Sequence, residues 1–521
     1  MSDTTIPATS TADAALVHSI RQVMTRAHQM SGASVRSQHP KTHGVVQATF
    51  HIHELPAAYR VGVFAAPRSV AAWIRFSNGK ETDDRNRDVR GMAIKLLDVS
   101  GETVAPDSAN ATTQDFVLAD HPVFFAKDAA HFLQFLSLKG KHGAELKSAS
   151  DTGATDRTAA LKKEHQAQLL AAFPLLAEFL DLARSPLTRR YFSQTPYRFG
   201  DAAVKYFVRP DKAPESDPLP ASADALRDSM VRVLTTERAP VRFAFGIEVQ
   251  TRPEDMPIDD ASVRWNSPEE AVLATITIPP QEFTSEERRA FGEALSFSPW
   301  HSRPAHAPLG SINEARRDAY MDSSLTRHAA TLMDRRAPAA SHFNALTLSR
   351  FFDCFSRGDV EGMQMCLHPE VEFRDIGFDL RGREVAAMWD MIVSKKISVT
   401  YRDLNVDGQA GTAHWECDYE FRKDAESQPR PVHNVIDSTF RFDGGLIRAH
   451  EDVCDFWTWF EQAMGPAAAG AHAVDVIEGT LDQIFKRDIP LDIEEKIRAK
   501  VRETAQGKIA AFIAQHPEYA G

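Results

Sequence analysis

The chain has 521 residues, which is too long for one hydrophobic core, so two or more domains are expected. Apolar residues make up 43% of the chain and charged residues 25%, the balance of a soluble globular protein. The net charge of −12 argues against a nucleic-acid or anionic-membrane partner, and no apolar run reaches the roughly 18 residues of a transmembrane helix.

The N-terminal segment shows no targeting signal. Residues 1–12 are small and polar and are predicted to be a disordered lead-in, and no basic region precedes an apolar block, which favours a cytoplasmic protein. The cysteines have no CxxC spacing, so buried free thiols are expected rather than a zinc or redox site. All of them lie after residue 350, which indicates two modules; they are Cys354, Cys366, Cys417 and Cys454.

The first module is predicted to cover residues 13–335. Helical patterns span 127–138 and about 158–183, and 211–225 lacks apolar periodicity and is predicted to be a surface loop. Because the strand-like runs are not regularly interleaved with helices, an antiparallel β-barrel with surrounding helices is favoured over a doubly wound sheet. The predicted strands are 45–53, 71–77, 91–99, 241–250 and 271–278.

The second module is predicted to cover residues 342–521, after the Pro-containing stretch RRAPAAS at 335–341. Two helices followed by a meander of long strands indicate an α+β cone, with the helices on one face of a curved antiparallel sheet. A weak break at 465–473 precedes a C-terminal helix that we expect to cover the cone. The predicted helices are 343–357, 382–394 and 491–513, and the predicted strands are 397–404, 411–422, 433–443 and 445–453.

A possible metal ligand lies near the end of the first module. Ser311-Ile-Asn-Glu314 has the form of a capping box, so a helix is predicted to begin there, which puts Arg316 and Tyr320 on one face. A guanidinium stabilises a neighbouring phenolate, which is the form of tyrosine that binds ferric iron. Taken alone, the pair is more often an exposed Arg stacked on a Tyr.

Four further stretches accompany this pair. They are Arg75-Phe-Ser77, the run Arg87-Asp-Val-Arg-Gly-Met-Ala-Ile-Lys95, the run Asp115-Phe-Val-Leu-Ala-Asp-His-Pro-Val-Phe-Phe125, and Arg36-Ser-Gln-His-Pro-Lys-Thr-His-Gly44. In this order, and ending in Arg316-x-x-x-Tyr320, they resemble the haem catalase family. The match is nearest to the shorter catalase-related peroxidases, a group that includes the allene oxide synthase type.

The resemblance implies a haem b site. Tyr320 would be the axial ligand of the iron, and Arg316 would hold it as phenolate. His39 would lie on the distal face and move a proton between the peroxide oxygens. His43, four residues further on, is a rival for that role, although the register of the motif favours His39. The same resemblance implies that Arg36 and Arg75 pair with the haem propionates. It also implies that Phe124, Phe125 and Phe132 line the haem pocket, with plain core packing as the alternative for each.

One position departs from the family pattern. The resemblance aligns Asp120 with the family's distal Asn, and a carboxylate cannot donate a hydrogen bond unless it is protonated. We therefore expect a haem-dependent hydroperoxidase that uses hydrogen peroxide or an organic or lipid hydroperoxide, rather than an efficient catalase. The alternatives are a fatty-acid hydroperoxide rearranging enzyme of the allene oxide synthase type and a non-catalytic haem- or lipid-binding protein.

The second module resembles the polyketide cyclase and ketosteroid isomerase (SnoaL-like) superfamily. The resemblance rests on Phe351–Asp359, His368–Phe373, Arg381–Arg383 and Phe442–Asp452. It implies a cone with a pocket and either an isomerase or cyclase activity, or a binding or dimerisation domain that would make the protein a homo-oligomer. Four side chains are expected to face the pocket, with Asp452 or His450 as a possible base; the other two are Tyr401 and His433.

Overall fold

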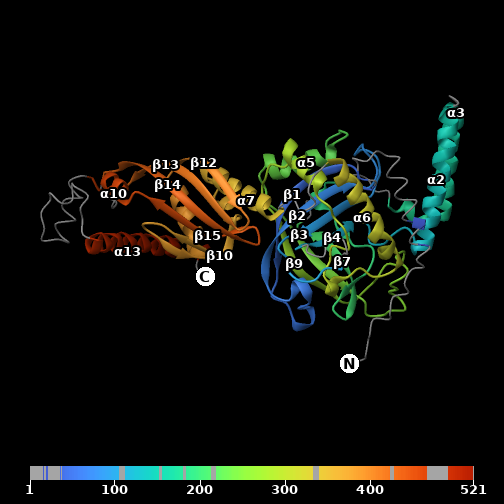
Figure 1. The fold of residues 1–521 in the computed structure, drawn as a ribbon, viewed down its shortest axis with the longest axis horizontal. Helices are drawn as coiled ribbons and strands as arrows, with labels where there is room; N and C mark the ends of the chain where they lie inside the picture. Colours follow the sequence, from blue (N-terminus) through green and yellow to red (C-terminus); the bar gives the residue numbers. More distant parts are fainter. Residues whose placement is uncertain are drawn as a thin grey trace. The chain divides into compact units, whose positions relative to one another are not determined.

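The computed structural model describes residues 16, 19–20, 36, 38–104, 112–151, 155–179, 184–212, 219–331, 339–422, 428–465 and 491–519. The chain divides into two compact units, residues 1–337 and 338–521 (Figure 1). The predicted lead-in lies outside the described residues, and so does the predicted break from residue 466 onward.

The first unit is built on a closed antiparallel sheet. Its strand order is β5-β4-β3-β2-β1-β9-β8-β7-β6, and β5 also pairs with β7, which closes the ring. The antiparallel barrel predicted from the sequence is therefore confirmed. The strands are β1 (Thr42–Ile52), β2 (Arg68–Asn78), β3 (Arg90–Leu96), β4 (Gln114–Ala119), β5 (Tyr191–Phe192), β6 (Tyr197–Phe199), β7 (Ala202–Pro210), β8 (Val241–Val249) and β9 (Glu270–Ile278).

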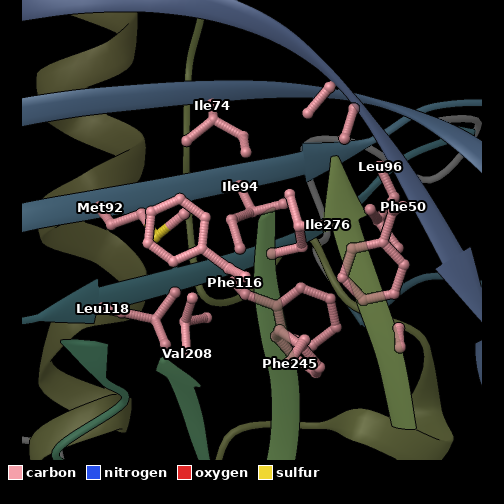
Figure 2. Close-up of a cluster of buried hydrophobic side chains, with 14 of the residues drawn as sticks. Phe50, Ile74, Met92, Ile94, Leu96, Phe116, Leu118, Val208, Phe245 and Ile276 are labelled. Atoms are coloured by element: carbon pink, nitrogen blue, oxygen red, sulfur yellow. The ribbon is translucent and has the colours of Figure 1, made fainter. Parts of the chain in front are cut away.

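Every second residue of the strands fills the barrel interior. Phe50, Phe116 and Phe245 meet there, with ring centroids 5.0 Å apart for Phe50 and Phe245 and 4.7 Å apart for Phe116 and Phe245 (Figure 2). Burial of each such ring contributes about 1.5–3 kcal/mol. Because successive side chains of a strand point to opposite faces, Arg75 and Ser77 of β2 lie on the outer face of the barrel. The interior is therefore core, and a functional site belongs outside it.

Helices surround this barrel, and α2 and α3 form a hairpin that extends away from it (Figure 1). The predicted helix over 158–183 is wrong at its end, because α3 stops before Pro174, whose ring fixes φ and disfavours helix in the preceding residue. No helix of the described ranges is long and apolar enough to cross a bilayer. The helices are α2 (Ala129–Asp151), α3 (Thr155–Ala172), α4 (Ala225–Val231), α5 (Glu286–Ala294) and α6 (Ser311–Thr331).

The second unit is an α+β domain, as predicted. Its sheet has the order β11-β10-β15-β14-β13-β12. Two details differ from the prediction: β10 pairs with β15 in parallel, and β10 and β11 precede the second long helix. The elements are α7 (Ala339–Arg357), α8 (Val360–Gln364), β10 (Leu367–Arg374), β11 (Asp379–Arg381), α9 (Arg383–Val393), β12 (Ser398–Asp407), β13 (Ala410–Phe421), β14 (Arg430–Asp443), β15 (Leu446–Cys454), α10 (Phe456–Met464) and α13 (Leu491–Gln515).

Candidate functional site

The predicted metal ligand lies on α6 with its predicted partner. Arg316 donates a hydrogen bond from Nη2 to the hydroxyl of Tyr320 across 3.0 Å, and from Nη1 to Oδ1 of Asn313 across 3.1 Å. Burial lowers the pKa of Arg316, but the neighbouring phenols of Tyr320 and Tyr197 outweigh burial and leave it raised. A fixed cation therefore stands beside the Tyr320 oxygen, as a phenolate ligand requires.

The helix that carries this pair begins where the sequence predicts. Gly310 precedes it with φ of +85°, a conformation that favours glycine, and an added Cβ would meet the carbonyl oxygen of Ile258 at 2.8 Å. The backbone N–H of Ser311 donates to Oδ1 of Asp259 at 2.8 Å. The first turn of α6 is thus anchored by a distant segment of the same unit as well as by its own sequence.

His39 lies at the end of the segment before β1. Its backbone has φ of +55°, and its Nδ1 is 3.1 Å from the hydroxyl of Ser77. Arg75 donates to the carbonyl oxygen of His39 at 2.7 Å. A Cβ on Gly91 would lie 2.6 Å from His39 Nδ1, so the absence of a side chain at position 91 makes room for the imidazole.

The electrostatics of His39 connect it with α6. Burial, followed by the charges of Arg75 and Arg316, lowers the pKa of His39 to about 4. The imidazole is therefore neutral near pH 7 and able to accept a proton. The charge of Arg316 thus reaches His39, although the two residues are far apart in sequence.

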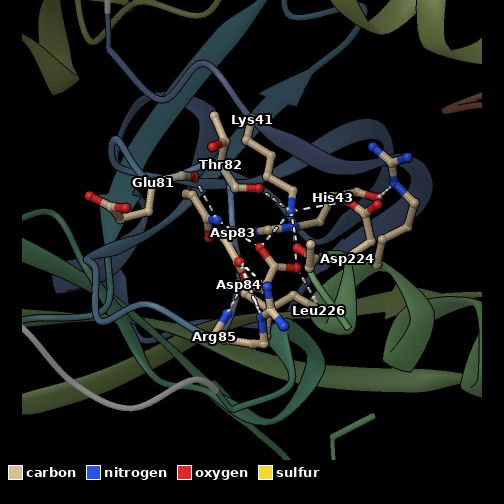
Figure 3. Close-up of polar contacts among 12 residues, drawn as sticks. Lys41, His43, Glu81, Thr82, Asp83, Asp84, Arg85, Asp224 and Leu226 are labelled. Carbon is tan, nitrogen blue, oxygen red and sulfur yellow. Dashed lines mark hydrogen bonds and ion pairs between the residues drawn. The ribbon is translucent and has the colours of Figure 1, made fainter. Parts of the chain in front are cut away.

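His43, the rival candidate, belongs to a separate buried network (Figure 3). Its Nε2 is 2.8 Å from Oδ1 of Asn78, and its Nδ1 is 3.9 Å from Asp84, which also pairs with Lys41 at 2.9 Å. Burial lowers the pKa of His43 to about 3, against the opposing charge of Asp84. These contacts tie β1 to the segment after β2.

The two arginines predicted to bind propionates differ in their contacts. Arg36 forms an ion pair with Glu293 of α5 and donates to the carbonyl oxygen of Leu295 at 2.5 Å. Arg75 is buried and also donates to the hydroxyl of Thr42 at 2.6 Å. In the structure Arg36 thus joins the segment before β1 to the end of α5, whereas Arg75 lies against the backbone of His39.

Asp120 directly follows β4, and both of its carboxylate oxygens have partners. Oδ1 accepts a hydrogen bond from the backbone N–H of Arg90 at 2.8 Å, and Oδ2 pairs with Arg189. Burial raises the pKa of Asp120, while Arg189 opposes the rise. The structure therefore gives Asp120 a definite bonding role that joins β3, β4 and the segment before β5.

The three predicted phenylalanines form one aromatic group. Phe124 lies 4.5 Å from Phe125 and 5.5 Å from Phe132, measured between ring centroids. All three are half-buried, and Phe132 packs in a cluster with Ala315 of α6. The group therefore adjoins α6, the helix that carries Tyr320. Its contact there, Ala315, directly precedes Arg316.

Ser77 and Gly91 lie within the sequence motifs, but the sequence analysis assigned no role to them or to Tyr197. Ser77 follows Arg75 by two residues, so the strand periodicity places both on one face and could have identified it. Gly91 and Tyr197 act through contacts that no spacing reveals: the first adjoins His39, and the second is a buried phenol beside Arg316.

In the second unit, a cavity of about 450 Å³ opens among the sheet, α9, α10 and α13. Of the four side chains predicted to face it, only Asp452 is among its lining residues. Tyr401 donates to Asp353 at 2.7 Å, and His433 is 52% exposed and lies 2.9 Å from Asp418. These two predictions are wrong.

His450 lies behind the cavity wall. Its Nε2 is 2.8 Å from Oδ1 of Asp452, and its ring stacks on Trp389 with centroids 5.6 Å apart. It therefore orients Asp452 from the core side. The sequence analysis missed Asp375, which lines the same cavity from the turn between β10 and β11.

One family model and several solved structures are similar to parts of the chain. Residues 348–450 match the SnoaL-like domain family. No curated protein sequence matches the chain. Among solved structures, the chain is similar to a bacterial catalase with 16% identity and a TM-score of 0.41, over 64% of this chain and 66% of that one. The similarity thus spans just under two thirds of the length of the catalase.

Two smaller proteins are similar to parts of the chain. One is an LEH-like epoxide hydrolase from M. tuberculosis, with 17% identity and a TM-score of 0.21 over 26% of this chain and 98% of that one. The other is an NTF2-like protein from Burkholderia pseudomallei, with 15% identity and a TM-score of 0.20 over 23% of this chain and 97% of that one. The strand order establishes the barrel of the first unit, and the family match shows that the second unit contains a SnoaL-like domain.

Proposed function

We propose that the first unit is a haem-dependent hydroperoxidase that reduces hydrogen peroxide or an organic hydroperoxide with electrons from an organic donor. The observation that carries the proposal is the hydrogen bond from Arg316 to Tyr320, on a helix whose cation also acts on the half-buried imidazole of His39. The four motifs that precede this pair in the sequence and resemble haem catalases add further support.

The residues present fit a haem. A phenol with a fixed guanidinium donor suits ferric iron, and the neighbouring phenylalanines suit the faces of a porphyrin. Tyr320 would hold the iron, and Arg75 offers a cation for a propionate. When bound, the haem supplies the redox-active iron at which the O–O bond of the peroxide is broken.

His39 supplies the proton transfer. Because its imidazole is neutral near pH 7, it can accept the hydroperoxide proton and return it to the oxygen that leaves as water or alcohol. Ser77, at 3.1 Å from Nδ1, orients the ring. Asp120 takes no part in this step, since Arg90 and Arg189 occupy both of its oxygens.

The decisive test compares wild type with Tyr320→Phe, each produced with ample haem. We expect the wild type to bind haem with a tyrosinate-type absorption spectrum and to reduce hydrogen peroxide or a fatty-acid hydroperoxide. Tyr320→Phe should lose both the spectrum and the activity, because no phenolate remains to bind the iron.

Product analysis separates the alternatives. An alcohol as the product of a fatty-acid hydroperoxide supports the peroxidase, whereas an epoxide or a ketol supports rearrangement. A haem spectrum without any turnover would instead support a non-catalytic haem-binding protein. If the wild type binds no haem at all, the proposal is wrong.

A further inference from the structure

The cavity of the second unit has mostly apolar walls. Its volume of about 450 Å³ lies within the range of small-molecule sites, roughly 300–1,000 Å³. Trp389, Trp415 and Ile436 contribute from α9 and the sheet, and Ile497 and Val501 contribute from α13. An occupant must therefore have a largely hydrocarbon body.

Two carboxyl groups interrupt these apolar walls. Oδ1 of Asp375 accepts from the backbone N–H groups of Gly377 at 2.7 Å and Phe378 at 2.5 Å, and Oδ1 of Asp452 accepts from Ser438. Among the described residues, no donor contacts the second oxygen of either carboxyl. Each second oxygen can therefore interact with an occupant of the cavity.

The Asp375 carboxyl is able to donate a hydrogen bond. Burial and then the charge of Asp452 raise the pKa of Asp375 to about 7, against the backbone N–H groups of Gly377 and Phe378 and the charge of Arg502 on α13. A large share of Asp375 is thus protonated at neutral pH, and a protonated carboxyl donates to a hydroxyl or carbonyl oxygen.

Lysines line the same cavity at its exposed side. Lys500 pairs with Glu503 at 2.7 Å, but within the described segments no carboxylate lies at ion-pair distance from Lys395 or Lys508. Burial lowers the pKa of Lys395, and the charge of Lys508 lowers it further, so the two ammonium groups repel each other. An anion between them would relieve this repulsion.

We propose that this cavity binds a long-chain carboxylic acid that carries a hydroxyl or oxo group along its chain. The carboxylate lies at Lys395 and Lys508, the hydrocarbon chain lies against the apolar walls, and the chain oxygen accepts a hydrogen bond from Asp375. Only the source of the ligand rests on the proposed function, because reduction of a fatty-acid hydroperoxide yields such a hydroxy acid.

The first test measures binding of 12-oxooctadecanoic acid to the full-length protein by isothermal titration calorimetry at pH 6.5. We expect its methyl ester to bind about 10-fold more weakly, since the ester carries no charge for the lysines. The double variant Lys395→Gln/Lys508→Gln should lose the same factor for the acid and nothing for the ester. Lys496→Gln, an exposed lysine of α13 outside the cavity lining, is the matched control and should bind as wild type does.

The second test concerns the chain oxygen. At pH 6.5 the oxo acid should bind several-fold more tightly than octadecanoic acid, and this preference should fade as the pH rises through about 7, because Asp375 loses its proton. Asp375→Asn keeps an oxygen for the two backbone N–H groups and gains a permanent donor, so it should keep the preference at pH 8.

Two results would overturn the proposal: equal affinity for acid and ester, or no preference for the oxo acid at any pH. Tyr320→Phe makes the two proposals separable. This variant should lose haem and yet bind the fatty acids as the wild type does. The haem proposal can therefore fail while the cavity proposal holds, and the cavity proposal can fail while the haem proposal holds.

Discussion

The two candidate sites use opposite charges to keep a titratable group neutral. In the barrel unit, burial and the guanidinium groups of Arg75 and Arg316 lower the pKa of His39 to about 4. In the second unit, burial and the carboxylate of Asp452 raise the pKa of Asp375 to about 7. The imidazole is left ready to accept a proton, and the carboxyl is left ready to donate one.

This contrast shows what kind of ligand each site favours. A site with two guanidinium groups favours anions such as phenolate, carboxylate or a peroxide that is losing its proton. A site with two facing carboxyl groups disfavours a second negative charge at the same place, so only a neutral oxygen is expected there, and the anionic end of a ligand must lie at the lysines.

The largest expected effect comes from removing the proton acceptor of the barrel site. His39→Gln should lower kcat/KM for peroxide by about 10²–10⁴-fold, because general acid–base catalysis contributes that much. The haem spectrum should remain that of wild type. In the wild type, kcat/KM should fall only as the pH drops through about 4, since His39 stays neutral above that value.

His43→Gln is the matched control for this comparison. Because His43 belongs to the network of Asn78 and Asp84, its loss should reduce the free energy of unfolding by about 1–3 kcal/mol with little change in kcat/KM. The reverse outcome, in which His43→Gln loses turnover and His39→Gln does not, would exchange the roles of the two histidines.

Removing the cation beside Tyr320 should have the next largest effect. Arg316→Leu takes away a charged hydrogen bond to the phenol, and such bonds are worth about 1.5–3 kcal/mol, or roughly 10- to 150-fold in activity. The absorption spectrum should change with the activity. Arg317→Leu removes an exposed arginine from the next position of α6 and should leave both unchanged; an equal loss in the two variants would indicate a general helix defect.

A smaller loss is expected from Gly91→Ala, which adds a Cβ 2.6 Å from His39 Nδ1 and 2.9 Å from the Ser77 hydroxyl. Displacement of the imidazole should reduce kcat/KM by about 10-fold, because proton transfer depends on position. Gly140→Ala is the control: nothing lies within 4 Å of its Cβ position, and alanine favours helix α2, so activity should be unchanged. Full activity in Gly91→Ala would place the proton acceptor elsewhere.

Much of the fold follows from local patterns, and the misses have physical reasons. Strands β1, β2 and β3 were predicted from their β-rich sequences, and their alternate residues fill the barrel core while most residues of the opposite face are buried as well. Strand β7 (Ala202–Pro210) was not predicted, because its sequence AAVKYFVRP lacks a clear alternation of apolar and polar residues. The end of α3 was missed although Pro174 marks it.

The residues of the two candidate sites also fall into those that the sequence could indicate and those that only the structure reveals. The resemblance to haem catalases named Tyr320, Arg316 and His39 as candidates, and the structure adds the contact of His39 with Ser77 and the influence of Arg316 on its pKa. Asp375 could not have been found, because it lies in a turn and its chemistry comes from Asp452, which a parallel strand pair brings near from far along the chain.

The smallest expected effect is a change in stability with pH, which should have opposite signs for Asp375 and His39. A carboxyl whose pKa is raised in the folded state stabilises the fold below its unfolded pKa, and this contribution is lost as the pH rises through the folded value. For Asp375, stability should therefore decline between about pH 4 and pH 7. Asp375→Asn removes this dependence and should stabilise the second unit by about 1–3 kcal/mol at pH 8 relative to wild type.

Differential scanning calorimetry of the full chain at pH 5 and pH 8 measures this difference as a change in the transition of the second unit. His39→Gln provides the opposite case. The pKa of His39 is lowered in the folded state, so folding disfavours protonation, and wild type should lose stability as the pH falls below the ordinary value near ~6.5, while the variant should not. A change of stability with pH in the same direction for both units would contradict this account. Burial and nearby charge would then not explain why His39 and Asp375 are neutral.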